Sequence, residues 1–245
     1  MLSKYKYHLW LHLIILIWGF TGVIGKELGL LETTAVTIVF YRMLIGFISL
    51  FIVLRLLKHK IRITKKGIFA TLGTGLIIAA HWITFFKSIQ LSNISLALVF
   101  LSTTALFTSF IEPIILKRKY DFKESLMGIT IIVGIAIIAN TSSDYYLAMI
   151  LALISALGAA FFSVINGKLV QEHDPKSITI FEMLGGFIGV AIFFSLTGEL
   201  NTETLTIDWK QFSYLFILGS ICTAFLRSSS ASSIFLFLSN QLYAK

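Results

Sequence analysis

The chain has 245 residues, of which 57% are hydrophobic and only 13% are charged, and its mean hydropathy is +0.89. A soluble domain of this length must cover its surface with polar side chains, so this composition excludes soluble enzymes and soluble binding modules. The formal net charge is +8, but the cations lie in short loops between apolar segments. That placement is typical of loops beside a membrane and argues against nucleic acid as a partner.

Eight apolar segments approach the length of about 20 residues that a helix needs to cross a membrane. They are His8–Ile24, Thr34–Leu57, Gly67–Ser88, Ile94–Leu116, Ser125–Asn140, Tyr146–Val170, Ser177–Thr197 and Phe212–Leu226. The first segment lacks a small-residue cleavage site and is followed by further spans, so we interpret it as a span and not as a signal peptide. The lipid bilayer is therefore the first predicted partner.

The distribution of Lys and Arg predicts the orientation of these segments. If the N-terminus is cytoplasmic, 15 of the 20 Lys and Arg residues lie on the inner face. Three, namely Lys26, Lys87 and Lys210, lie on the outer face, and Arg42 lies inside a span. We therefore expect a multi-pass protein of the cytoplasmic membrane with a cytoplasmic N-terminus.

The two halves of the chain resemble each other. Residues 41–48 read YRMLIGFI and residues 181–188 read FEMLGGFI, and one segment later Gly75 corresponds to Gly219. Five spans separate the start of one unit from the start of the next, so the second unit enters the membrane from the opposite side. Inverted repeats of this kind are used by secondary transporters, which hold the substrate near the midplane between the halves. The alternative is an accidental match of short apolar strings.

Four short stretches resemble the EamA family of the drug/metabolite transporter superfamily. They are Ile17–Thr21 (IWGFT), Phe40–Arg42 (FYR), Phe85–Ser92 (FFKSIQLS) and Gly128–Asn140. The similarity covers about residues 8–225. It implies ten helices in two inverted five-helix repeats, a central cavity, and transport of small metabolites or drugs.

The chain departs from the family pattern near its end, where five of the seven residues 227–233 are serines. We expect a first repeat at 8–140 with five spans and an incomplete second repeat at 146–226 with three. An atypical Ser-rich tail occupies 227–245, as if the chain were truncated or frame-shifted after about residue 225. The predicted fold is an all-α integral membrane bundle of about eight helices.

Arg42 and Glu182 are the strongest candidate site residues. Ionisable side chains inside a span are costly and are therefore functional candidates by default. The two positions correspond in the repeat, and inverted symmetry would bring them together near the midplane, where opposite charges lower each other's cost of burial. We expect them to pair across the repeat interface or to line a substrate pathway, with Arg42 contacting an anionic group. A purely structural ion pair is the alternative.

Three further candidate site residues have aromatic side chains. His81 could carry protons for coupling, although a membrane histidine also serves simply to hydrogen-bond a neighbouring helix. Trp18 and Tyr41 could stack on a substrate, or they could fill the core or lie at the membrane interface.

Thr104, Thr108 and Glu112 recur every four residues and therefore share one helix face. Pro113 removes a backbone donor, so this stripe could form a polar, bent wall of a substrate pathway. Alternatively, Glu112 lies near the inner interface and pairs with Lys117 or Arg118.

The favoured function is a secondary transporter that moves a small molecule by alternating access without ATP. No G-x-x-x-x-G-K-[ST] loop is present. The single cysteine, Cys222, and the lack of an H-E-x-x-H pattern predict neither a metal site nor a cofactor. A membrane enzyme, a channel and a nonfunctional truncated product remain the alternatives, and a homodimer is left open.

Overall fold

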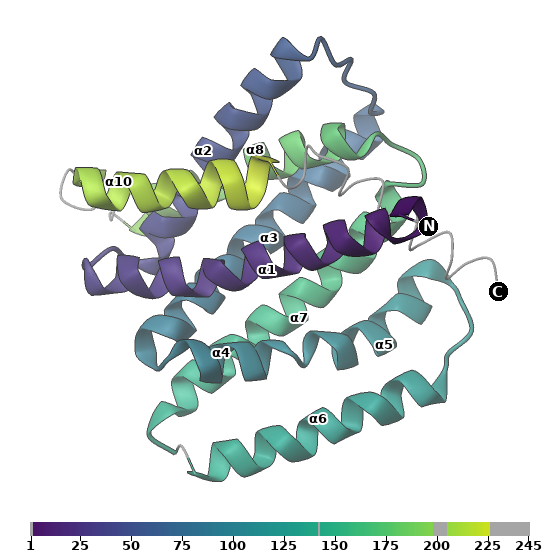
Figure 1. The fold of residues 1–245 in the computed structure, drawn as a ribbon, viewed down its shortest axis with the longest axis vertical. Coiled ribbons are helices and arrows are strands. Elements are labelled where there is room, and N and C mark those ends of the chain that lie inside the picture. The colour runs from purple at the N-terminus through teal and green to yellow at the C-terminus, as the bar shows by residue number, and fades with distance from the viewer. Residues whose placement is uncertain (1, 142, 198–204, 226–245) are drawn as a thin grey trace.

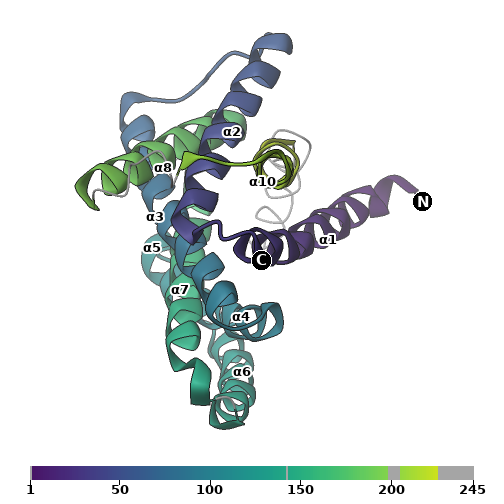
Figure 2. The same ribbon diagram turned by 90° about the vertical axis from the view of Figure 1, so that its left-hand side faces the viewer.

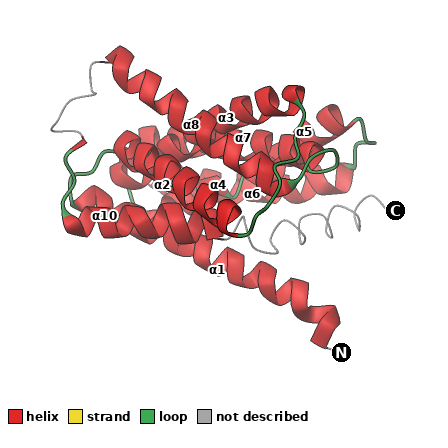
Figure 3. Ribbon diagram, turned by 90° about the horizontal axis from the view of Figure 1, so that it is seen from above, coloured by secondary structure: helices red, strands yellow, loops and turns green. Residues whose placement is uncertain are grey.

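In the computed structural model, which describes residues 2–141, 143–197 and 205–225, all regular elements are helical (Figure 1, Figure 3). In chain order they are α1 (Leu2–Leu30), α2 (Ala35–Leu56), α3 (Lys65–Leu91), α4 (Ile94–Leu101), α5 (Thr104–Leu116), α6 (Phe122–Thr141), the 3₁₀ turn η1 (Ser143–Tyr145), α7 (Tyr146–Leu169), α8 (Pro175–Thr197), α10 (Trp209–Phe216) and the π-helix η2 (Ile217–Phe225). The predicted all-α membrane bundle is confirmed. The predicted Ser-rich tail at 227–245 lies outside the described residues.

Within the described ranges, six segments are long and apolar enough to cross a membrane. They are His12–Leu30, Ala35–Leu56, Lys65–Leu91, Ile94–Leu116, Tyr146–Leu169 and Pro175–Thr197. The predicted fifth and eighth segments also form helices, α6 and the pair α10–η2, but they are not among these six. In the eighth, α10 has 8 residues and η2, which follows it directly, has 9, and the residues after Phe225 lie outside the described ranges.

Short polar side chains fix where several helices begin. Thr34 accepts a hydrogen bond from the Thr37 N–H at the start of α2, and Thr64 accepts one from the Gly67 N–H at the start of α3, both at 3.1 Å. Asp208 forms a reciprocal capping box with Gln211 at the start of α10. These caps satisfy backbone donors that a helix N-terminus leaves without a partner.

The predicted fourth span is two helices, α4 and α5, with an interruption at Ser102 and Thr103. The hydroxyls of Ser102, Thr103 and Thr104 each donate to the carbonyl three residues earlier, at 2.6, 2.6 and 2.7 Å. Such bonds compete with the helical ladder and tighten the turn. The interruption therefore comes from three consecutive hydroxyl residues, whereas Pro113 lies inside α5.

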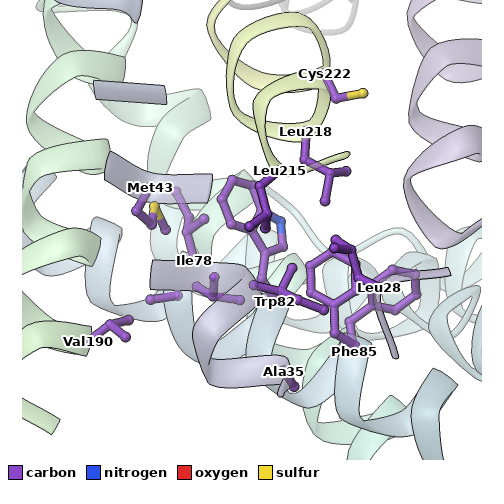
Figure 4. Close-up of a cluster of buried hydrophobic side chains, with 14 of the residues drawn as sticks. Leu28, Ala35, Met43, Ile78, Trp82, Phe85, Val190, Leu215, Leu218 and Cys222 are labelled. Carbon is purple, nitrogen blue, oxygen red and sulfur yellow. The ribbon is translucent and has the colours of Figure 1, made fainter. Parts of the chain in front are cut away.

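Helix α3 is the centre of the bundle: it packs along α7 on one side and along α8 on another (Figure 1). Helix α2 packs against α8 and η2, and α5 lies between α7 and α6. Figure 2 shows α6 at the end of this layer, beyond α4 and α5. The main buried cluster joins side chains of α1, α2, α3, α4, α8, α10 and η2, including Met43, Ile78, Trp82, Leu215 and Leu218 (Figure 4).

Glycines bring the backbones of α3 and α8 into direct contact. A Cβ atom on Gly75 would overlap the Glu182 carbonyl oxygen and lie 2.8 Å from the Gly186 nitrogen. A Cβ on Gly185 would likewise lie 2.7 Å from the Leu72 Cα. Such close approach is the usual way in which helices associate in lipid, where there is little hydrophobic force between them.

The contact between α2 and α8 is reciprocal. A Cβ on Gly46 would lie 3.4 Å from the Met183 Sδ, and a Cβ on Gly186 would lie 2.9 Å from the Met43 Sδ. Met43 corresponds to Met183 and Gly46 to Gly186 in the two matching octapeptides, at an offset of 140 residues. The same glycine–methionine contact is therefore made twice, with the two halves exchanged. An interface with a two-fold axis has this property, because residue i meets j and j meets i.

The glycines that the sequence aligned behave in the same reciprocal way. Gly75 of α3 faces the carbonyl of Glu182, and a Cβ on Gly219 of η2 would lie 3.1 Å from the carbonyl of Arg42. Gly75 corresponds to Gly219 and Glu182 to Arg42 in the sequence alignment. The boundaries of the two predicted repeats stay a prediction, but four of their aligned positions make corresponding contacts.

The loop before α3 is hydrogen-bonded to the N-terminus of α8 at one end of the bundle. Asp174 caps α8: its Oδ2 accepts from the Ser177 N–H at 2.8 Å and from the Ser177 hydroxyl at 2.9 Å. His59 Nε2 lies 2.9 Å from the same oxygen. The Arg62 N–H donates to Ser177 Oγ at 2.9 Å, so the loop and the cap form one network.

Hydrogen bonds join a second set of loops at the other end. Gln90 Nε2 donates to the Thr33 carbonyl at 2.9 Å, and Gln211 Nε2 donates to the Leu31 carbonyl at 2.9 Å. Lys26 Nζ donates to the Ser92 carbonyl at 3.1 Å. The loops that are hydrogen-bonded to each other at each end are loops that the Lys and Arg distribution assigned to the same face of the membrane.

We expect Gly75→Ala to destabilise the protein strongly, because the added methyl group would overlap the α8 backbone, which cannot move aside as a side chain can. Gly73→Ala is the matched control: it lies on the same helix, is exposed, and a Cβ there meets nothing within 4 Å. Alanine should be neutral or stabilise α3 at that position by up to about 1 kcal/mol. Both effects are measured as the midpoint of thermal unfolding of the purified variants in detergent. Equal midpoints for Gly75→Ala and Gly73→Ala would contradict the backbone contact.

Asp174→Ala should lower the stability at neutral pH by about 0.5–2 kcal/mol, as loss of a helix cap does. Burial by itself would raise the pKa of the Asp174 carboxyl, but hydrogen bonds from His59 and Ser177 outweigh it and hold that pKa below its ordinary value of 3.8. The charged form therefore stabilises the folded chain above about pH 4, and this contribution is lost as the pH falls below that value.

Unfolding measured from pH 7 down to pH 3 should show the difference between wild type and Asp174→Ala narrowing only below about pH 4. The exposed Asp144 provides the control, since Asp144→Ala should leave the curve unchanged. A difference that is constant over the whole range would count against the lowered pKa.

Candidate functional site

Arg42, in the N-terminal half of α2, is only 3% exposed. Its guanidinium carbon lies 3.6 Å from the centre of the Trp82 ring on α3 and 5.8 Å from the centre of the Phe86 ring. A guanidinium over an indole face is attracted by the ring quadrupole, by about 2 kcal/mol or more where water is excluded. The aromatic rings of Trp82 and Phe86 therefore compensate part of the cost of burying this charge.

Thr223 of η2 provides a polar contact for Arg42. Arg42 Nε donates to Thr223 Oγ1 at 3.1 Å, and the same hydroxyl donates to the Leu218 carbonyl, five residues earlier, at 2.9 Å. The hydroxyl can do both because it carries one proton and two lone pairs. Residues 217–225 form a π-helix, a rare backbone form that is frequent at functional sites.

Glu182 is completely buried in α8, the helix that packs on both α2 and α3. Its backbone lies against Gly75. The structure thus places both predicted intramembrane charges in one bundle of four elements, α2, α3, α8 and η2. An ion pair between Arg42 and Glu182 stays a prediction.

Trp18 and Tyr41 reach the same region from its edges. Trp18 Nε1 donates to the Cys222 carbonyl of η2 at 3.3 Å, and its side chain is 49% exposed. The Tyr41 hydroxyl donates to the Leu205 carbonyl at 2.7 Å, and its ring packs edge-on against Phe40. Both polar groups hold backbone segments of the second half of the chain.

His81 lies elsewhere, on the face of α3 that contacts α7. Its Nδ1 is 2.8 Å from the Ser155 carbonyl, and the Ser155 hydroxyl donates to the His81 carbonyl at 3.0 Å. Nδ1 also lies 2.8 Å from the Ser155 hydroxyl oxygen; because a carbonyl only accepts, a hydrogen bond to the Ser155 carbonyl requires the proton on Nδ1. This geometry is that of a histidine that joins two helices, the alternative weighed above; a role in proton coupling stays a prediction.

The stripe of Thr104, Thr108 and Glu112 lies on α5, away from Arg42. The Thr108 hydroxyl donates to the Thr104 carbonyl at 2.7 Å, within its own helix. Glu112 Oε1 lies 3.0 Å from Arg118 Nε, the interfacial pairing that was the alternative to a pathway role. The predicted candidates therefore fall into three places, and only the group around Arg42 brings several of them together.

The sequence analysis did not single out Trp82 or Thr223 as site residues. A helical pattern could have found both, since Trp82 follows Gly75 by seven residues and Thr223 follows Gly219 by four. Residues at these spacings share a helix face. The aligned glycines therefore mark the faces that meet Arg42.

Comparison with protein families gives one finding: the model of the EamA-like transporter family matches residues 5–140. No curated protein sequence matches the chain. Across the part of the chain that the structure describes, no three His, Cys, Asp or Glu residues are grouped so that they could hold a metal ion.

Thr223→Val should destabilise the protein by about 1–3 kcal/mol, because it removes the hydroxyl between a buried guanidinium and a buried carbonyl. Thr74→Val is the control: Thr74 is also buried, but its hydroxyl donates only within its own helix, to the Ala70 carbonyl. Thermal midpoints of the two variants should differ clearly. Equal effects would show that the Arg42 contact adds nothing to stability.

Proposed function

The chain belongs to the EamA-like transporter family, which the match over residues 5–140 shows, and from that premise we propose that it is a secondary transporter of small metabolites or drugs. In this proposal the substrate passes Arg42 and Trp82 between the two halves of the bundle. The preferred substrates carry an anionic group, which Arg42 recognises.

The buried charge of Arg42 is the single observation that carries the proposal. A guanidinium stays protonated at every physiological pH, so the bundle contains a permanent positive charge at 3% exposure. Charges at this depth are expensive and mark substrate or ion pathways in membrane proteins. A carboxylate or phosphate matches the fork of a guanidinium with two parallel hydrogen bonds.

The reciprocal contacts support alternating access as the mechanism. Between α2 and α8, Gly46 packs against Met183, and the corresponding Gly186 packs against Met43. In transporters built from inverted repeats, one unit rocks against the other around a fixed site near the midplane. Arg42 and Glu182 are aligned positions in the two units, so we place the proposed site at their interface.

The grouping of loops supports the proposed topology, with the N-terminus in the cytoplasm and the protein in the cell membrane. The loop with His59 and Arg62 contacts the one with Asp174, whereas Thr33, Gln90 and Gln211 meet at the other end. The first group is the one rich in Lys and Arg, and such loops stay on the cytoplasmic side.

A channel and a membrane enzyme are the competing proposals. A channel would give flux that does not saturate with substrate concentration, and an enzyme would change its substrate chemically. Counterflow in proteoliposomes separates all three, because only a carrier exchanges labelled for unlabelled substrate through one saturable site.

We expect Arg42→Gln to lower saturable uptake of anionic substrates at least about tenfold, the loss typical of one charged hydrogen-bonded contact. Uptake is measured in proteoliposomes with a panel of labelled mono- and dicarboxylates, with neutral sugars for comparison. Arg42→Lys keeps the charge but not the fork, so it should raise KM more than it lowers the maximal rate.

Arg55→Gln is the control, because Arg55 is an exposed cation at the end of the same helix. It should transport like wild type. Each variant is first checked for a monodisperse folded chain in detergent. Folded Arg42→Gln that transports carboxylates at the wild-type rate would exclude the proposed role of Arg42, and a lack of saturable uptake for the whole panel would exclude carboxylate transport.

A further inference from the structure

The connection between α2 and α3 is strongly and uniformly basic. Residues 55–66 contain six cations and no acidic residue. All six are exposed: Arg55, Lys58, Lys60, Arg62, Lys65 and Lys66. Figure 1 shows this connection as the loop that leaves the end of α2 and descends to the start of α3, at one extremity of the bundle.

Exposed aliphatic side chains alternate with these cations. Leu56 is 77% exposed, Leu57 is 62% exposed and Ile61 is 49% exposed. A surface that binds a small soluble anion has no need of such groups. The boundary between lipid headgroups and acyl chains accommodates both, because cations meet the headgroups while aliphatic side chains lie against the chains.

The part of the connection between the two helices, residues 57–64, is held in place although it is not helical. The Asp174 N–H donates to the Arg62 carbonyl at 3.3 Å, and the Arg62 N–H donates to Ser177 Oγ at 2.9 Å. Nearer α2, the His59 N–H donates to the Leu54 carbonyl at 2.9 Å. The cations are therefore presented by a braced segment, which lowers the entropy lost when a ligand orders them.

A second basic segment provides a natural comparison. Residues 117–123 contain Lys117, Arg118, Lys119 and Lys123, but Asp121 lies among them and Glu112 Oε1 is 3.0 Å from Arg118 Nε. Part of this charge is compensated within the protein. The 55–66 connection has no acidic residue of its own, and Asp174 contacts it through His59 and the Arg62 backbone.

We propose that residues 55–66 form a binding surface for anionic phospholipids of the adjacent leaflet. The headgroup phosphates meet the lysines of the connection, and Leu56, Leu57 and Ile61 lie at the top of the acyl chains. The surface is separate from Arg42, so it does not depend on the identity of the transported substrate.

The test uses the full chain purified in detergent and titrated with phosphatidylglycerol or phosphatidylcholine, with bound lipids counted by native mass spectrometry. The wild type should bind phosphatidylglycerol at least about tenfold more tightly than phosphatidylcholine. The triple variant Lys58→Gln, Lys60→Gln, Lys65→Gln should lose at least about tenfold in phosphatidylglycerol affinity, since each cation near a lipid surface contributes about fivefold.

The matched control Lys117→Gln, Lys119→Gln, Lys123→Gln removes the same net charge from the second basic segment, where Asp121 and Glu112 compensate part of the charge, and should lose clearly less affinity than the first triple variant. Equal losses in the two triple variants would overturn the proposal, because binding would then follow net charge alone. Equal affinity of the wild type for the two lipids would overturn it as well. So would tight binding of soluble glycerol phosphate that the first triple variant abolishes, since that result would indicate a solute site.

Discussion

The close backbone contact of four helical elements is the constraint on which the rest of the structure depends. In lipid, apolar side chains gain little by leaving their surroundings, so helices associate through close packing at small residues. Gly75 and Gly185 allow α3 and α8 to touch, and Gly219 lets η2 approach α2. Larger residues at these positions would separate the helices and disrupt the packing of the buried cluster around Met43.

The burial of Arg42 follows from that packing. Because α2, α3 and η2 are close, the guanidinium contacts both the Trp82 ring and the Thr223 hydroxyl. Its carbon lies 3.6 Å from the ring centre, and its Nε lies 3.1 Å from the hydroxyl oxygen. A permanent charge in such surroundings is costly, and the contacts described here that compensate it come from α3 and η2. Arg42 and Trp82 belong to the first half of the chain and Thr223 to the second, so a movement between the halves would change the Thr223 contact and with it the surroundings of the charge.

Different kinds of hydrogen bond connect the loops at the two ends of the bundle. At one end a capped helix, α8, is hydrogen-bonded to a basic loop through Asp174 and Ser177. At the other, amide side chains such as Gln211 bond to backbone carbonyls. Both networks join the first half of the chain to the second, so each is a place where opening of the bundle would break a small number of identifiable hydrogen bonds.

The sequence by itself determined the all-helical membrane architecture, because apolar segments of spanning length leave the backbone no other way to satisfy its hydrogen bonds in lipid. It also singled out Arg42 and Glu182, since intramembrane charges are rare whatever surrounds them. Only the tertiary structure decided that Trp82 and Thr223 contact Arg42, that His81 binds Ser155 on α7, and that the predicted fourth span divides at Ser102. These features depend on which helix faces meet and on competition among local hydroxyl bonds, and neither is encoded in the apolar pattern of a single segment.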